Sequence, residues 1–171
     1  MRLFIAINFS WELKQALNEQ IEKLKTIAYR GNFTLPENLH LTLAFLGKVE
    51  PFKIPLIKQA MQGVEVAPFK LTLGGLGVFR RKDGDLYWLA VQKNSYLLSL
   101  HEQLWKGLVE WNGKERFRPH ITLGRRVFLK EKLLWEEFGE NWAITVQEIS
   151  LMQSERIKGK LIYREKYVKK L

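Results

Sequence analysis

Two short strings of the same type recur in the chain, and this repetition constrains the fold more than any other feature. The first is His40-Leu41-Thr42-Leu43-Ala44, and the second, about 80 residues later, is His120-Ile121-Thr122-Leu123-Gly124. Each string lies on an expected strand that follows an expected strand, helix and linker. The offset exceeds the period of solenoid repeats. The sequence therefore predicts one domain over residues 1–171, made of two similar halves covering about residues 1–82 and 83–171.

Apolar spacing predicts the elements of the first half. Ser10 is the expected N-cap of the first helix, because its side chain can accept a hydrogen bond from a free backbone N–H group. The expected elements are a strand over 2–9, a helix from 11 to about 28, a linker over 29–36, a strand over 38–47, a helix over 54–63, a strand over 69–76 and a turn at Asp83-Gly84.

The same order is expected in the second half. Ser95 is the expected cap of an amphipathic helix whose apolar stripe runs to Trp111. The remaining expected elements are a strand over 86–92, a linker over 113–119, a strand over 120–127, a short helix over 130–138, and strands over 143–152 and 161–168 joined through Lys158-Gly159.

Composition narrows the function classes. The chain has no cysteine, which excludes disulfides, thiolate metal ligands and thiol nucleophiles. Its formal net charge of +10 favours a polyanionic partner or a phosphorylated ligand, although a lysine-rich solvated surface would give the same number. No window has the length of a membrane helix or the pattern of a signal peptide. We therefore expect a cytoplasmic protein with no membrane association.

Strand geometry turns the two strings into a candidate site. Side chains alternate between faces of a strand, so His40, Thr42 and Ala44 share one face, and the corresponding residues of the second string do the same. If the two strands lie side by side, their faces line one cleft. One imidazole can then accept a proton from water while the other protonates a leaving oxygen, and the threonine hydroxyls can donate to phosphate oxygens.

Two other interpretations of the histidines remain open at this point. They could be buried, hydrogen-bonded side chains with no chemical role. They could also bind a metal, but zinc requires three or four ligands, and neither string places a carboxylate on the histidine face.

The paired H-x-T strings in a duplicated chain of this length resemble the 2H phosphoesterase superfamily. Within it, residues 38–47 (NLHLTLAFLG), residues 118–125 (RPHITLGR) and the start RLFIAI resemble the bacterial and archaeal RNA 2′,3′-cyclic phosphodiesterases, once named 2′-5′ RNA ligases. The resemblance implies an α/β (α+β) bilobal fold with two antiparallel sheets facing a central cleft and helices packed outside. It covers nearly the whole chain.

The resemblance also implies an activity and its residues. A 2′,3′-cyclic phosphate on RNA or on a nucleotide would be hydrolysed to a 2′-phosphate, with no cofactor, no metal and no obligatory protein partner. His40 would be the proton donor and His120 the proton acceptor. The implied ligands are Thr42, Thr122 and Arg125 for phosphate and Phe45 for base stacking. Strict alternation would turn Arg125 and Phe45 away from the histidine face, unless a bulge at Gly124 or an early strand end near Phe45 intervenes.

Other features fit less specific roles. His101 lies on an apolar helix stripe and is expected to be structural. Gly74-Gly75-Leu76-Gly77 lacks the phosphate-loop pattern and is expected to be a bulge or turn. The basic tip at 80–82 and the charged tail at 164–170 could face RNA or be a solvated turn and an edge strand. The competing functions are a 2′-5′ RNA ligase, which runs the same chemistry in reverse, and a non-catalytic basic RNA-binding module.

Overall fold

The computed structural model describes residues 1–111 and 116–171. Its α-helices are α1 (Trp11–Ile27), α2 (Ile54–Gln62) and α3 (Ser95–Gly107), with short 3-10 turns at Pro36–Asn38, Pro51–Lys53, Val109–Trp111 and Trp135–Phe138. Its strands are β1 (Arg2–Asn8), β2 (Ala28–Phe33), β3 (His40–Lys48), β4 (Phe69–Phe79), β5 (Asp85–Val91), β6 (His120–Leu129), β7 (Asn141–Val146), β8 (Glu148–Ile157) and β9 (Lys160–Lys170).

The strands form two antiparallel sheets. The four-stranded sheet has the order β3-β1-β8-β9, and the five-stranded sheet has the order β2-β6-β5-β4-β7. β3 pairs with β1 as β6 pairs with β5, so the two H-x-T strands hold corresponding places. β3 and β6 are also neighbours across the two sheets. The expected two-sheet α+β fold is confirmed.

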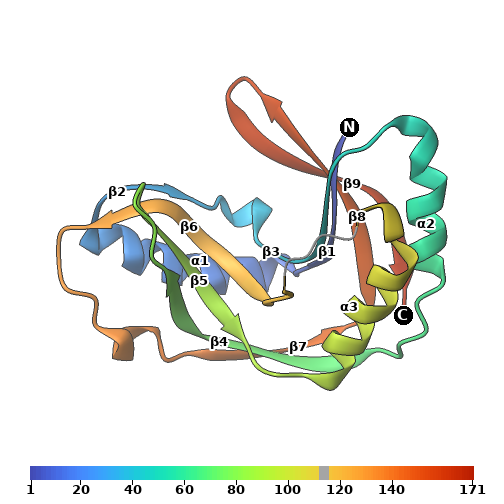
Figure 1. Cartoon of the computed structure of the whole chain (residues 1–171). Coiled ribbons are helices and arrows are strands. Elements are labelled where there is room, and N and C mark those ends of the chain that lie inside the picture. The colour runs from blue at the N-terminus through green and yellow to red at the C-terminus, as the bar shows by residue number, and fades with distance from the viewer. Residues whose placement is uncertain (112–115) are drawn as a thin grey trace.

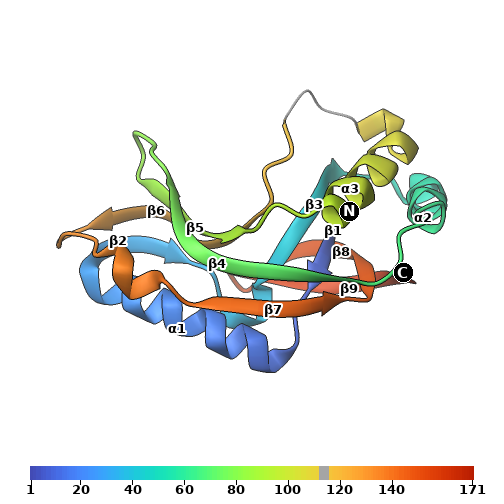
Figure 2. The ribbon, with the colours of Figure 1, turned by 90° about the horizontal axis from the view of Figure 1, so that it is seen from below.

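Each sheet carries helices on one side. α1 packs against β2 and β6 of the five-stranded sheet, whereas α3 contacts β3 and α2 contacts β9 of the four-stranded sheet. Figure 1 shows this arrangement, and Figure 2 shows α2 and α3 together at one end of the molecule. One main apolar cluster buries the helix stripes and the core-facing side chains of both sheets. The other faces of β3 and β6 are therefore free to line a site.

Ser10 caps α1 as expected: its side chain accepts a hydrogen bond from the backbone N–H of Leu13. The expectation that Ser95 caps α3 is wrong, because the side chain that accepts from Leu97 N–H belongs to Asn94. Both assignments are chemically equivalent, since asparagine and serine are among the best N-caps. The helix stripe also ends earlier than expected, at Gly107, and Trp111 lies in the following 3-10 turn.

Three other expectations are wrong. Residues 29–33, expected as linker, belong to β2, which pairs with β6. The expected helix over 130–138 is reduced to the 3-10 turn at its end. The single strand expected over 143–152 is two strands: β7 pairs with β4 in one sheet and β8 with β1 in the other, so the chain changes sheet at Gln147. The expected linker over 113–119 lies partly outside the described residues.

In the part of the chain that the structure describes, no helix is both long and apolar enough to cross a lipid bilayer.

Candidate active site

A pocket of about 490 Å³ opens between the two sheets and brings the residues expected from the sequence together. It is lined by all six of them: His40, Thr42, Phe45, His120, Thr122 and Arg125. The other lining residues come from the end of β2, from Asn38 and from the β8–β9 hairpin: Asn32, Phe33, Thr34, Leu35, Asn38, Arg156, Gly159, Lys160, Leu161 and Tyr163. The two H-x-T strands therefore contribute to one pocket.

Both imidazoles are oriented in the same way by the backbone. His40 Nδ1 lies 2.7 Å from the carbonyl oxygen of Asn38, and His120 Nδ1 lies 2.7 Å from that of Arg118. A carbonyl can only accept, so each Nδ1 carries a hydrogen and donates. In the neutral ring Nε2 is then the basic nitrogen. His40 Nε2 lies 2.9 Å from the hydroxyl oxygen of Thr42.

The surroundings of the two rings favour their neutral forms. Burial lowers the pKa of His40 to about 4, and the positive charges of Lys14, Arg125 and His120 act in the same direction. Burial also lowers the pKa of His120, with further contributions from Arg125 and Arg81. The pocket is therefore electropositive before any ligand enters, and an anion bound beside the rings would shift both pKa values upward.

A β-bulge at the same place in β3 and β6 brings Phe45 and Arg125 into the pocket, although strict alternation would turn both away from it. Leu43 and Ala44 on β3 are both buried, and the register against β1 shifts there. Leu123 and Gly124 on β6 are likewise both buried, with a register shift against β5. An extra residue reverses the alternation that follows it. Phe45 and Arg125, the next residues, consequently line the pocket.

Arg125 and Thr122 lie next to each other on β6. The Nη2 atom of Arg125 donates to the Thr122 hydroxyl over 3.5 Å. Burial lowers the pKa of the Arg125 guanidinium, and an arginine side chain keeps its positive charge at neutral pH. This pair places a positive charge and a hydroxyl donor beside His120.

Aromatic rings that the sequence did not single out support each histidine. The His40 ring lies 4.9 Å from Phe4 and 5.2 Å, edge to face, from Tyr163. The His120 ring lies 5.6 Å from Phe79 and 6.1 Å from Trp88. Phe4 could have been found in the sequence, because it alternates onto the pocket face of β1. Tyr163 could not, because its position depends on how β8, its partner in the same hairpin, pairs with β1 near the other end of the chain.

The charged residues that line the pocket are all positive. Arg125, Arg156 and Lys160 are cationic, and none of the sixteen lining residues is a carboxylate. Guanidinium groups and hydroxyls are the side chains that bind phosphate oxygens best. The expectation from the sequence missed Arg156 and Lys160, which lie in a hairpin about 35 residues after the second string.

In the two described segments, 1–111 and 116–171, no group of three or more His, Asp or Glu side chains is placed to hold a metal ion. Among the described residues, the Thr42 hydroxyl is the only polar side-chain group that hydrogen-bonds to the His40 Nε2 atom. The two imidazoles are the candidate acid–base groups of the pocket.

The remaining expectations have clear structural outcomes. His101 stacks on Phe117 at 3.8 Å and on Trp105 at 5.3 Å, away from the pocket, as expected for a structural histidine. Gly74 and Gly75 have positive φ angles at an irregularity in the pairing of β4 with β5, which confirms the expected bulge. β9 is an edge strand, which is one of the two interpretations of the charged tail.

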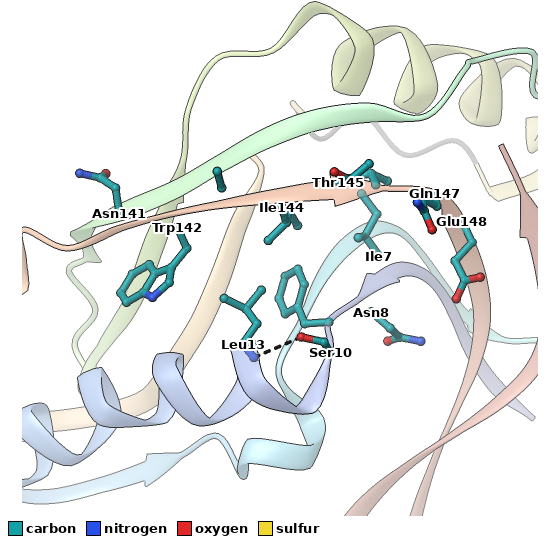
Figure 3. A pocket seen from close by; sticks show the side chains of 13 residues that line it. Ile7, Asn8, Ser10, Leu13, Asn141, Trp142, Ile144, Thr145, Gln147 and Glu148 are labelled. Atoms are coloured by element: carbon teal, nitrogen blue, oxygen red, sulfur yellow. Dashed lines mark hydrogen bonds between the residues drawn. The ribbon is translucent and has the colours of Figure 1, made fainter.

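A second, larger cavity of about 740 Å³ lies elsewhere, between the end of β1, the start of α1 and β7 (Figure 3). Its lining contains no histidine, and its one charged residue, Glu148, forms an ion pair with Lys170. Apolar side chains such as Trp142 and Ile144 line it together with polar ones such as Asn141 (Figure 3). The smaller pocket contains the groups capable of acid–base chemistry, and it is the candidate active site.

This fold, with one H-x-T strand in each sheet, defines a class of protein, and comparison of the chain with known proteins identifies that class. The chain matches the 2′-5′ RNA ligase superfamily over residues 13–158 and belongs to that family. It is 38% identical, over 82% of its length and 77% of the relative's, to the RNA 2′,3′-cyclic phosphodiesterase of Thermotoga maritima. It is 33% identical to the protein of the same name from Thermus thermophilus, covering 91% of this chain and 82% of that one.

Solved structures agree with the family. A crystal structure of E. coli LigT complexed with 3′-AMP superimposes with a TM-score of 0.83 at 28% identity, covering 99% of this chain and 96% of that one. A phosphoesterase crystal structure superimposes with a TM-score of 0.86 at 26% identity, covering 99% and 97% of the two chains. The resemblance drawn from the paired strings is thus confirmed.

Proposed function

We propose that the protein hydrolyses 2′,3′-cyclic phosphates at RNA ends or on nucleotides, producing a 2′-phosphate. The observation that carries the proposal is the matched orientation of His40 and His120: each Nδ1 is held by a backbone carbonyl, and both rings line one cationic pocket. Hydrolysis of a phosphodiester needs one group that accepts a proton from water and another that donates a proton to the leaving oxygen. The curated relatives named above carry the same activity in their names.

The proposed reaction uses the two Nε2 atoms in opposite protonation states. Neutral His120 accepts a proton from the attacking water, whose oxygen forms a bond to phosphorus. The bond from phosphorus to the 3′ oxygen breaks, and protonated His40 gives its proton to that oxygen. Thr42, Thr122 and Arg125 donate to the non-bridging oxygens, whose negative charge grows in the transition state.

The low pKa of His40 is compatible with a proton-donating role only when substrate is bound. At neutral pH the empty site holds His40 mostly neutral, because its pKa lies at about 4. A bound phosphate brings negative charge next to the ring, favours the imidazolium and offsets the effect of Arg125 and Lys14. Substrate binding and protonation of the donor are therefore coupled in this proposal.

Phe45 is the proposed platform for the nucleobase. Its side chain is 67% exposed at the pocket rim, which is unusual for a phenylalanine and leaves one ring face open for stacking. RNA with cyclic phosphate ends is accordingly the proposed partner. The cytoplasmic location expected from the sequence stays a prediction that fractionation of cells would test.

Product analysis tests the proposal. The protein is incubated with adenosine 2′,3′-cyclic phosphate and with a cyclic-ended oligonucleotide, in the presence of a chelator and without added nucleotide. We expect a 2′-phosphate as the product in both cases. A 3′-phosphate product would show that the 2′ oxygen, not the 3′ oxygen, is the leaving group. A strict requirement for a divalent ion would contradict the two-histidine mechanism.

A further inference from the structure

One cationic side chain of the pocket lies on a different wall from the groups assigned to the cyclic phosphate. Arg156 is exposed and lines the pocket from the β8–β9 hairpin, whereas Arg125 belongs to β6 of the other sheet. Figure 1 shows this hairpin extending beyond the four-stranded sheet. The two guanidinium groups therefore belong to different sheets on either side of the cleft.

The hairpin geometry directs Arg156 to the pocket. Lys158 and Gly159 both have positive φ angles, 48° and 81°, which is the type I′ turn that favours a tight two-residue hairpin. Arg156 pairs with Leu161, and residues directly opposite each other in an antiparallel pair point to the same face. Leu161 and Tyr163 line the pocket, so Arg156 is on the pocket face of its strand.

Alternation along β8 also leaves Arg156 without an acidic partner. The neighbouring Glu155 points to the opposite face and forms an ion pair with Arg164 at 3.2 Å. In the described part of the chain the one hydrogen bond of the Arg156 guanidinium goes to the carbonyl of Gly159, at 3.3 Å. A single weak backbone contact leaves most of its five donors available for an anion.

The hairpin is tied to the strand that carries His40. The side-chain amide of Asn38, which is 5% exposed, donates to the carbonyl of Leu161 over 2.8 Å. Tyr163, two residues further along β9, contacts the His40 ring edge to face. Arg156 is thus held at a fixed place relative to His40 rather than on a freely moving loop.

We propose that Arg156 forms a second anionic subsite, which binds the phosphate on the 5′ side of the nucleotide whose 2′,3′-cyclic phosphate is hydrolysed. The inference rests on the proposed function. The histidines, threonines and Arg125 hold the cyclic phosphate, and a pocket of about 490 Å³ accommodates a nucleoside between that group and the hairpin. The preferred substrate is therefore an oligonucleotide end, whose terminal nucleotide carries a 5′ phosphate, rather than a cyclic nucleoside with a free 5′ hydroxyl.

Lys160 lines the same end of the pocket but pairs with Ile157, whose side chain is on the opposite face from Arg156. We therefore assign the main contact to Arg156. Lys158, in the turn itself, carries the same charge without lining the pocket, and it provides a matched control.

The test compares two substrates that differ in one group: adenosine 2′,3′-cyclic phosphate with a 5′ hydroxyl and the same compound with a 5′ phosphate. We expect kcat/KM of the wild-type protein to be about tenfold higher for the phosphorylated compound, the size of a charge-assisted contact at an exposed site. The ratio should fall close to one in Arg156→Ala and be partly restored in Arg156→Lys. It should keep its wild-type value in Lys158→Asn, where asparagine tolerates the positive φ angle. Higher salt should lower the wild-type ratio.

The two proposals fail in different ways. If the wild-type protein hydrolyses both compounds with equal kcat/KM, or if Arg156→Ala keeps the wild-type ratio, the second subsite is refuted and the proposed function stands. If Lys158→Asn loses the ratio as fully as Arg156→Ala, general surface charge explains the preference and the subsite is again refuted. If the wild-type protein hydrolyses neither compound, the proposed function itself is refuted, and the subsite with it.

Discussion

The Nδ1 atom of His120 lies 2.7 Å from the carbonyl oxygen of Arg118, two residues earlier in the chain. The same relation joins His40 to Asn38 in the other sheet. Each ring is therefore oriented by a backbone carbonyl two residues before it. In the described part of the chain neither ring pairs with a carboxylate that would stabilise the imidazolium, so burial dominates and the pKa of each ring is lowered.

Proton uptake should accompany anion binding. The rings are mostly neutral in the empty site near pH 7, because their pKa values lie below the usual 6.5. A bound phosphate raises those values, so protons must be taken up from solution. Calorimetry of inorganic phosphate binding at pH 7, in buffers of different ionisation enthalpy, should report net uptake. Net release would show that the bound anion does not act on the two rings.

The hydrolysis rate should have a bell-shaped pH dependence, since the active form holds one proton between the two histidines. Because both pKa values are lowered in the free protein, the acidic limb of kcat/KM should lie below the ordinary imidazole pKa of 6.5. A profile of kcat/KM against pH checks this. An acidic limb above pH 6.5 would contradict the burial of the two rings.

Stability should depend on pH through His40. Its folded-state pKa of about 4 lies below the unfolded value of 6.5, so below pH 6.5 the unfolded chain binds a proton that the folded chain does not. The free energy of unfolding should therefore fall as the pH decreases from 6.5 toward 4, by about 2–3 kcal/mol from this residue. Urea unfolding at pH 7.5 and pH 4.5 should show a smaller decrease for His40→Asn than for the wild type. Equal decreases would mean that His40 titrates normally in the folded protein.

A pair of glycine variants should separate packing near His120 from general backbone effects. A Cβ atom at Gly77 would lie 2.3 Å from the ring of Trp88, which in turn lies beside His120. Gly77→Ala should lower the free energy of unfolding by about 1–3 kcal/mol and reduce the hydrolysis rate, because the ring must move. Gly63→Ala, whose Cβ has only contacts of 3.6 Å or more, should do neither. Melting curves and rates of both variants check this, and equal effects would show that the Trp88 contact has no special role.

The proton donor can be identified with an altered leaving group. A phosphodiester with a nitrophenolate leaving group needs little protonation, so it should largely restore the rate of a variant that lacks the donor. With His40 as donor, His40→Ala should be rescued and His120→Ala should not. Rescue of His120→Ala instead would exchange the two roles.

The sequence predicted the two H-x-T strands because their signals are local, whereas the two antiparallel sheets were expected from the family resemblance. The alternation around His40 and His120 sets the faces of β3 and β6 regardless of the rest of the chain. β2 was missed because its sequence, AYRGNF, has no regular alternation and is held as a strand by its pairing with β6. The break at Gln147 was missed because apolar residues continue on both sides of it, although the two strands belong to different sheets.

The sequence predicted those pocket residues whose position depends on the local pattern of a single strand. The bulge considered at Gly124 is present, and its counterpart at Ala44, rather than an early strand end, brings Phe45 to the rim. Tyr163 and Arg156 were not predicted, because the pairing of β8 with the distant β1 and the Asn38 contact place the β8–β9 hairpin beside the pocket. Such long-range contacts leave no local pattern.

The rate of 2′-phosphate release by single histidine variants tests the central claim most directly. Under the two-histidine mechanism, His40→Ala and His120→Ala should each hydrolyse a cyclic-ended oligonucleotide roughly 10²–10⁴-fold more slowly than the wild type. Circular dichroism should show that both variants keep the native fold. Near wild-type hydrolysis by either folded variant would contradict the account.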